Sequence, residues 1–269
     1  MENTITSRQN PQVQYLKSLH QKKYRDREGK FLIEGWRFVG EALEAGVPVE
    51  KVVFSTSARE DRRYPQLLAV VEDREIQLIH MADNVLVVVA ETEQPQGVVA
   101  LVRQTETDLE SILQKNAEPF LLVVDGIRDP GNLGTVIRTA DAAGMTAVVL
   151  LPGTADLYNG KTLRSTMGSV FHLPICNSDT AVLTELLRDR GIPLLAADVA
   201  GDAPVYSVPL TGTLAIAVGS EVEGASKEIL QAAQHRVTIP MPGRAESLNA
   251  AVASGIIIFE AVRQRAGNP

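Results

Sequence analysis

Three segments in the C-terminal half of the chain combine polar side chains with sharp glycine and proline turns. They are DGIRDPGNLGTVIRTADAAG from Asp125, AVGSEVEGAS from Ala217 and IPMPGRAESLNAAVASGIIIFEA from Ile239. Each reads as a strand, a turn and a helix, and such turns let a ligand approach the backbone closely. Three backbone-rich corners could therefore converge on one small ligand. The chain lacks a GxGxxG fingerprint and a GK[ST] phosphate loop, so dinucleotide or ATP binding is not supported.

The polar side chains in these segments have two possible roles each. Asn132 and Arg138 could serve a ligand, or they could be a helix N-cap and a surface helix residue. Glu221 could accept hydrogen bonds from a ligand hydroxyl, or it could simply favour a helix N-terminus. Ser247 is a plausible N-cap for a long terminal helix, which would pack through an apolar face of Leu248, Val252, Ile256 and Phe259.

The elements that must position these residues are those of an α/β protein. The strand PFLLVVD before the first segment is an apolar run without alternation, which predicts a strand covered on both faces. Nearer the N-terminus, short apolar runs alternate with helical patterns, which favours helices packed on a central sheet. A polar stretch at residues 104–118 separates the two parts. We therefore expect a domain at residues 1–103, a linker at 104–118 and a second domain at 119–269.

Composition limits the class of protein. The chain has 269 residues and is 45% hydrophobic, which suits an enzyme of one or two domains. It lacks an apolar run near the roughly 20 residues that span a bilayer, and its first residues do not read as a signal peptide, so we expect a cytoplasmic protein without membrane contact. The lone Cys176 is expected to be a small buried residue, and the four histidines have no zinc-ligand spacing, so no metal is expected.

Charge is unevenly distributed along the chain. The net charge of −7 argues against a nucleic-acid partner, because phosphate contacts depend on Lys and Arg. Residues 1–30 nevertheless hold seven basic against three acidic side chains, and the basic ones include Lys22, Lys23 and Arg25. This segment reads as a basic helix that either contacts RNA or is simply a solvated amphipathic helix.

Taken in order, with IPM before SLN, the three segments resemble the SpoU (TrmH) family of S-adenosylmethionine-dependent RNA ribose 2'-O-methyltransferases. The resemblance implies a SPOUT-type α/β domain with a deep trefoil knot at its C-terminal end, S-adenosyl-L-methionine as cofactor and a homodimer. Asn10-Pro11, residues 31–35 and residues 95–97 are similar to the L30e-like substrate-binding domain found in many bacterial members. That likeness implies an N-terminal α/β domain that grips folded RNA.

The resemblance also implies roles for particular residues. Those matching cofactor-binding positions are Gly219, Ile239, Met241, Ser247, Leu248 and Asn249. Those matching the catalytic motifs are Asn132, Arg138, Glu221, Ser247 and Asn249. Arg164 lies in a segment that resembles one close to the active site in the family, where it either meets substrate phosphate or is simply a solvated helix residue. Because arginine stays protonated in proteins, Arg138 is expected to activate the ribose hydroxyl electrostatically rather than as a literal base. Ala250 departs from the family pattern, which commonly has Val there.

These implications lead to one expected function and two alternatives. The chain is expected to methylate a ribose 2'-hydroxyl in structured RNA, most readily 23S ribosomal RNA because L30e-like domains accompany many ribosomal RNA modifiers. Transfer RNA is the alternative substrate. A catalytically silent RNA-binding or ribosome-assembly protein is the alternative class, and the retained polar residues argue against it. The nucleotide itself is not readable from the sequence, because RNA is selected by shape and splayed bases.

Overall fold

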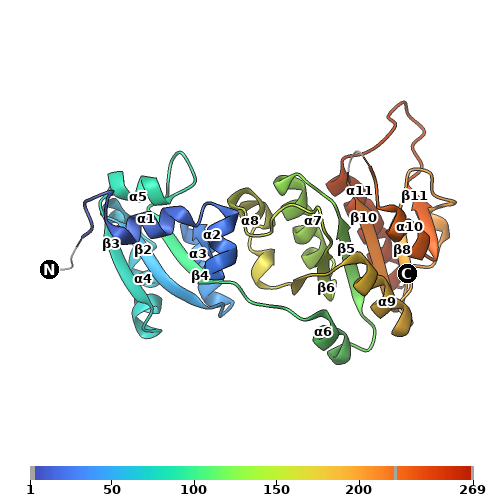
Figure 1. The fold of residues 1–269 in the computed structure, drawn as a ribbon, viewed down its shortest axis with the longest axis horizontal. Helices are drawn as coiled ribbons and strands as arrows, with labels where there is room; N and C mark the ends of the chain where they lie inside the picture. The colour runs from blue at the N-terminus through green and yellow to red at the C-terminus, as the bar shows by residue number, and fades with distance from the viewer. Residues whose placement is uncertain (1–3, 221–222, 268–269) are drawn as a thin grey trace. The chain divides into compact units, whose positions relative to one another are not determined.

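The structure, a computed structural model, describes residues 4–220 and 223–267, which form two compact units. Unit 1 comprises Met1–Thr105 and Tyr158–Leu163, and unit 2 comprises Glu106–Leu157 and Arg164–Pro269 (Figure 1). Within the described residues, none of the helices is both long and apolar enough to cross a bilayer.

Unit 1 is built on a four-stranded mixed sheet in the order β1-β4-β2-β3. Strand β4 runs antiparallel to β1 and β2, and β2 runs parallel to β3. The strands are β1 (Lys30–Glu34), β2 (Val49–Ser55), β3 (Gln77–Met81) and β4 (Val98–Arg103). The helices are α1 (Pro11–Ser18), α2 (Lys22–Glu28), α3 (Trp36–Glu44), η1 (Ser57–Glu60), α4 (Tyr64–Asp73) and α5 (Asp83–Val89).

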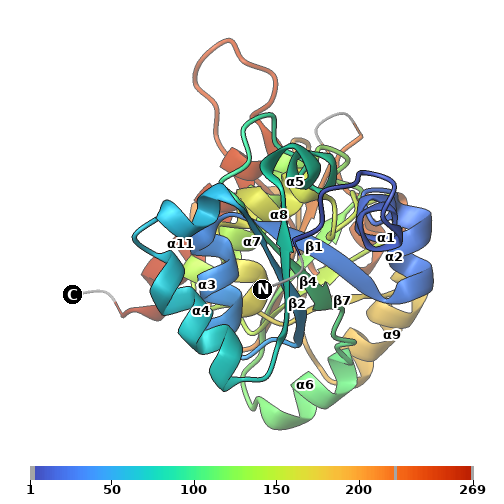
Figure 2. The same ribbon diagram turned by 90° about the vertical axis from the view of Figure 1, so that its left-hand side faces the viewer.

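Both faces of this sheet are covered, because successive side chains of a strand point to opposite faces. Val53 of β2 belongs to a buried cluster with residues of α1 and α5. Its neighbour Phe54 packs instead on Trp36 of α3 and Tyr64 of α4, with ring centroids 5.7 and 4.8 Å away. Figure 2 shows α3 and α4 on one side of the strands and α1 and α2 on the other. The expected α/β sandwich of the N-terminal part is confirmed.

Unit 2 is built on a parallel sheet of seven strands in the order β7-β6-β5-β10-β8-β11-β9. All six residues of β5 are buried, as expected for an apolar run covered on both faces. The strands are β5 (Phe120–Asp125), β6 (Ala147–Leu150), β7 (Ile175–Asn177), β8 (Leu194–Ala197), β9 (Ala203–Pro204), β10 (Leu214–Gly219) and β11 (His235–Thr238).

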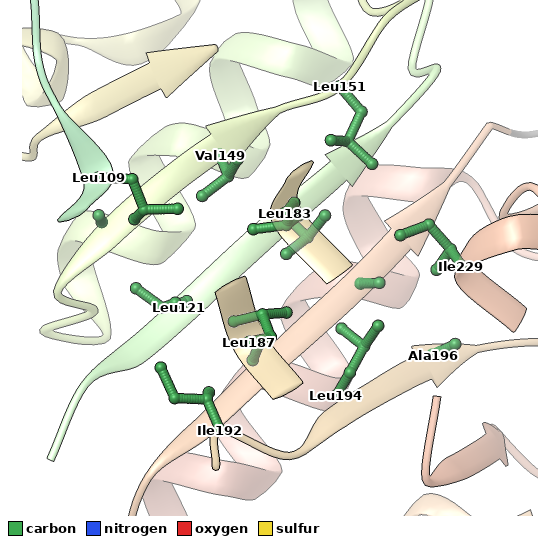
Figure 3. Close-up of a cluster of buried hydrophobic side chains, with 14 of the residues drawn as sticks. Leu109, Leu121, Val149, Leu151, Leu183, Leu187, Ile192, Leu194, Ala196 and Ile229 are labelled. Carbon is green, nitrogen blue, oxygen red and sulfur yellow. The ribbon is translucent and has the colours of Figure 1, made fainter. Parts of the chain in front are cut away.

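Helices pack on both faces of this sheet. Leu109, Leu183, Leu187 and Ile229, from three helices, form one buried cluster with Leu121 and other strand residues (Figure 3). On the other side, α7 and α11 pack against each other and against strands. The helices after Thr105 are α6 (Leu109–Lys115), α7 (Pro130–Ala142), α8 (Gly160–Thr166), η2 (Ser169–Phe171), α9 (Thr180–Asp189), η3 (Val205–Ser207), α10 (Lys227–Ala232) and α11 (Ala250–Arg265). The first residues of α8 belong to unit 1.

Helix α6 lies inside the stretch that the sequence presents as a polar linker. Asp108 caps it, its carboxylate accepting the backbone N–H of Ser111 at 2.9 Å. Leu109 and Leu113, one turn apart, are buried in the cluster of unit 2. Helix α6 is therefore anchored on the core of unit 2 by these two leucines, although the residues around them are polar.

Candidate active site

A cavity of about 380 Å³ opens at the carboxyl ends of β10, β8 and β11. Ligands of open parallel α/β sheets bind at this edge, and the volume lies in the range typical of small-molecule sites. Five residues expected to bind a cofactor line it, and they come from two of the three segments: Gly219, Ile239, Met241, Ser247 and Leu248. Leu248, Ile239 and Met241 are half-buried and give this wall apolar surface.

The backbone at Gly219 forms the closest part of the wall. A Cβ at this position would collide with the carbonyl of Gly224 and the amide of Ala225. Ser220 and Gly224 bond to each other through both backbone N–H groups, each at 3.0 Å, so the chain turns back sharply over Gly219. Only glycine leaves room for this return, and the backbone itself thereby reaches the cavity.

Asp125 ties the first segment to the second, and the sequence did not single it out as a site residue. It lies at the end of β5, directly beside Gly219 of β10 in the sheet register. Its buried carboxylate accepts the backbone N–H of Ser226 at 2.6 Å. The turn that lines the cavity is thus held from both of its ends. An Asp that ends a buried strand just before a glycine was the only available signal.

Asp198 and Arg236 form a second support that the sequence did not reveal. The guanidinium of Arg236 donates to one carboxylate oxygen of Asp198 at 2.6 and 3.0 Å, which raises the pKa of Arg236. Asp198 lines the cavity and follows β8, whereas Arg236 lies on the adjacent β11. Gly201 completes the contact, since a Cβ there would lie 2.6 Å from the carbonyl carbon of Val237. The pair therefore anchors one rim of the cavity.

The N-termini of α7 and α11 meet through two asparagines. The side-chain amide of Asn249 donates to Asn132 Oδ1 at 3.1 Å, while its own Oδ1 accepts the N–H groups of Ala251 and Val252. Asn249 is therefore the N-cap of α11, and the expectation that Ser247 caps this helix is wrong. Asp129 caps α7 by accepting the N–H of Asn132 at 2.9 Å, so Asn132 is not that helix's cap either. Both helices direct their positive ends toward this junction.

Arg138 lies apart from the cavity lining. It is exposed on α7, six residues beyond Asn132, and at about 100° per residue it faces a different side of the helix. Among the described residues, Arg138, Asn132 and Asn249 do not line the cavity. Glu221, also expected to be catalytic, lies outside the described residues. Its neighbour Glu223 does line the cavity and pairs with Arg128 of the first segment at 3.2 Å.

The residues expected to contact RNA differ in their surroundings. Lys22 and Lys23 are exposed on α2, and Lys22 pairs with Asp26 at 2.8 Å. Arg25 is buried, and its guanidinium donates to the carbonyls of Leu19 and His20 at 2.8 and 2.7 Å. Direct RNA contact by Arg25 is therefore contradicted: it closes the end of α1, where helix carbonyls lack partners. Arg164 is exposed on α8.

Cys176 and possible metal ligands were the remaining candidates for chemistry. Burial raises the pKa of the Cys176 thiol to about 11, so at neutral pH the group is a thiol in the core of unit 2, as expected. In residues 4–220 and 223–267, His, Cys, Asp and Glu side chains do not gather in threes around a possible metal position.

Comparison with known proteins matches both parts of the chain. Residues 119–259 match the SpoU rRNA Methylase family, and residues 10–100 match the MRM3-like substrate binding domain. The 23S rRNA (guanosine(2553)-2'-O)-methyltransferase RlmP of Bacillus subtilis is 36% identical over 95% of this chain and 97% of its own length.

Two solved structures have folds similar to that of this chain. The SpoU methyltransferase AviRb from Streptomyces viridochromogenes, in complex with the cofactor AdoMet, has a TM-score of 0.89 and 32% identity over 97% of this chain and all of its own. An AdoMet-bound rRNA methyltransferase from Sinorhizobium meliloti has a TM-score of 0.87 and 33% identity over 97% of this chain and 98% of its own.

Proposed function

The chain belongs to the SpoU rRNA Methylase family, and from this we propose that it transfers a methyl group from S-adenosylmethionine to a ribose 2'-hydroxyl of 23S ribosomal RNA. The observation that carries the proposal is the cavity, where five of the six residues expected to bind the cofactor meet at one edge of a parallel sheet. Relatives that match almost the whole chain are named as 23S rRNA 2'-O-methyltransferases, which supports ribosomal over transfer RNA.

The residues present suit S-adenosylmethionine. The turn over Gly219 offers backbone groups that a Cβ would displace, and the apolar side chains of Ile239 and Leu248 offer surface for an adenine ring. We assign Gly219, Ile239, Met241, Ser247 and Leu248 to the cofactor. When bound there, S-adenosylmethionine supplies an activated methyl group to a hydroxyl acceptor.

The protein's part in the reaction is alignment and charge stabilisation. Asn132 and Asn249 hold the ends of α7 and α11 together, which places two positive helix ends at one junction. We propose that Asn249 and Asn132 orient the acceptor ribose there. Arg138, protonated and exposed, is proposed to bind a flanking phosphate and to stabilise the alkoxide that develops as the 2'-hydroxyl loses its proton. Glu221 and Ser247 remain proposed members of the catalytic group.

The assembly and its setting are also proposals. Val252 and Phe259 of α11 are 52% and 48% exposed, and two large apolar side chains on one helix support a homodimer. We expect the deep trefoil knot of the family in unit 2, RNA gripped by an L30e-like domain near residues 1–103, and a catalytic domain at 119–269 on which α6 packs. A ribosomal RNA substrate would place the protein in the cytoplasm.

Two experiments test the proposal. Calorimetry with S-adenosylmethionine in the presence of a chelator should give metal-independent binding. Mapping of 2'-O-methyl groups in ribosomal and transfer RNA from a deletion strain should then show one missing group in 23S RNA. A missing group in transfer RNA would replace the substrate, and intact methylation of both would favour the silent RNA-binding protein.

A further inference from the structure

In addition to the cavity of unit 2, a groove of about 420 Å³ runs between α3 and α4 of unit 1. Three arginines line it: Arg37 from α3, Arg63 from the residue before α4, and Arg74 from the residue after it. Glu41 and Glu44 of α3 also line it, and lysine is missing from the lining among the described residues. The groove therefore carries its positive charge on guanidinium groups alone.

These guanidinium groups keep hydrogen-bond donors for a ligand. Arg63 donates through Nε and Nη2 to Asp61 at 2.8 and 2.7 Å, and Arg74 donates to the carbonyl of Leu43 at 2.6 Å. The Arg37 side chain is exposed on α3. A guanidinium has five N–H donors in a planar fork that matches phosphate, so each of the three retains capacity.

Gly40 and Trp36 give the groove its shape. Glycine is a poor helix former, yet Gly40 stands in the middle of α3. Packing among the described residues does not require it, since a Cβ there would meet no atom within 4 Å. The groove is therefore open beside the backbone of α3 at this position, which would let another backbone approach closely. Beside it lies Trp36, with the Arg63 guanidinium 5.2 Å from the centre of its ring.

We propose that this α3–α4 groove binds a stretch of RNA sugar–phosphate backbone. The proposal rests on the proposed function and names the surface of the N-terminal domain that contacts the substrate. Arg37, Arg63 and Arg74 bind phosphates through bidentate contacts, and Gly40 admits the strand. Exposed Glu44 presents an acceptor for a ribose 2'-hydroxyl, which RNA can donate. Acidic protein segments lack such a regularly spaced hydroxyl donor.

Trp36 is the only tryptophan of the chain and therefore reports directly on the groove. A 23S ribosomal RNA transcript titrated into the full-length protein should change Trp36 emission, because phosphate competes with Asp61 for Arg63 and shifts the stacked guanidinium. Arg37→Glu should weaken RNA binding by about tenfold or more and reduce the slope of log affinity against log salt by about one. Arg62→Glu is the matched control, because Arg62 is exposed next to Arg63 but does not line the groove. Equal effects of the two reversals would overturn the proposal.

Gly40→Leu gives a test that separates binding from folding. Leucine is the better helix former, and a Cβ at this position meets no atom within 4 Å, so the variant should unfold at the same temperature as the wild type or higher. It should nevertheless lose RNA affinity, because its side chain fills the groove, while Gly40→Ala should lose less. A stable Gly40→Leu protein with unchanged RNA affinity would refute the groove.

The outcomes also separate this proposal from the proposed function. If the wild type methylates RNA and all groove variants bind RNA as the wild type does, the groove proposal is refuted and the proposed function stands. If RNA binding depends on the groove but the wild type transfers no methyl group, the groove proposal stands and the proposed function is refuted. A change in Trp36 emission on addition of a polyglutamate peptide, without such a change on addition of RNA, would assign the groove to an acidic protein instead.

Discussion

Gly219→Ala should separate cofactor binding from folding. A Cβ at this position overlaps the backbone of Gly224 and Ala225, which cannot rotate away as a flexible side chain would. Overpacking costs about 1–3 kcal/mol when it is relieved by backbone shifts. The turn that must shift lies at the surface beside the cavity, so most of this cost should fall on ligand binding. We expect the affinity for S-adenosylmethionine to fall by about 10- to 100-fold, or about 1.4–2.8 kcal/mol.

The assay is calorimetric titration with S-adenosylmethionine, combined with a thermal unfolding curve for each variant. Gly243→Ala is the matched control, because it makes the same chemical change between Met241 and Ser247 where a Cβ meets no atom within 4 Å. The control should bind the cofactor like the wild type. Wild-type affinity in Gly219→Ala, or an equal loss in Gly243→Ala, would show that the tight return of the chain over Gly219 does not shape the site.

Three further predictions concern catalysis, pH and domain boundaries. Arg138→Ala should reduce methyl transfer by a hundredfold or more while leaving cofactor affinity within a few-fold, because Arg138 does not line the cavity; near-normal turnover would make it a plain surface residue. Hydrogen bonds from Arg263 and Gln264 lower the pKa of Glu260 to about 2, so its stabilising effect should be full above about pH 4.5 and vanish as the pH falls toward 2. Glu260→Gln should flatten the acid limb of a stability curve over that window, and an unchanged limb would contradict the assignment. A chain that begins at residue 105 should fold and bind S-adenosylmethionine, whereas one that begins at residue 118 loses the buried leucines of α6 and should unfold several kcal/mol more easily; equal stability of the two would count against a structural role for α6.

The sequence by itself determined the elements and the approximate location of the site. Apolar runs such as that of β5 predict buried strands, and the regular alternation of strands and helices predicts an α/β fold, because both signals depend on neighbours in the chain. The turn residues around Gly219 and Ile239 marked the backbone that lines the cavity for the same reason.

The choice among several residues able to cap one helix needed the tertiary structure. Ser247 and Asn249 both have side chains that can cap α11, and the sequence favoured the first. The structure uses Asn249, which also bonds to Asn132 on α7. The residue that caps α11 therefore also makes a contact with a residue 117 positions away in the sequence, and no local sequence pattern indicates that contact.

The burial and pairing of these charged side chains likewise depend on residues that are distant in the sequence. Arg25 looks like its basic neighbours in the sequence, yet it is buried against carbonyls at the end of another helix. Asp198 and Arg236 are 38 residues apart and meet only because β8 and β11 are adjacent in the sheet. Burial and pairing depend on which elements pack together, and the tertiary structure alone sets that packing, so the sequence could name the charged residues but not their roles.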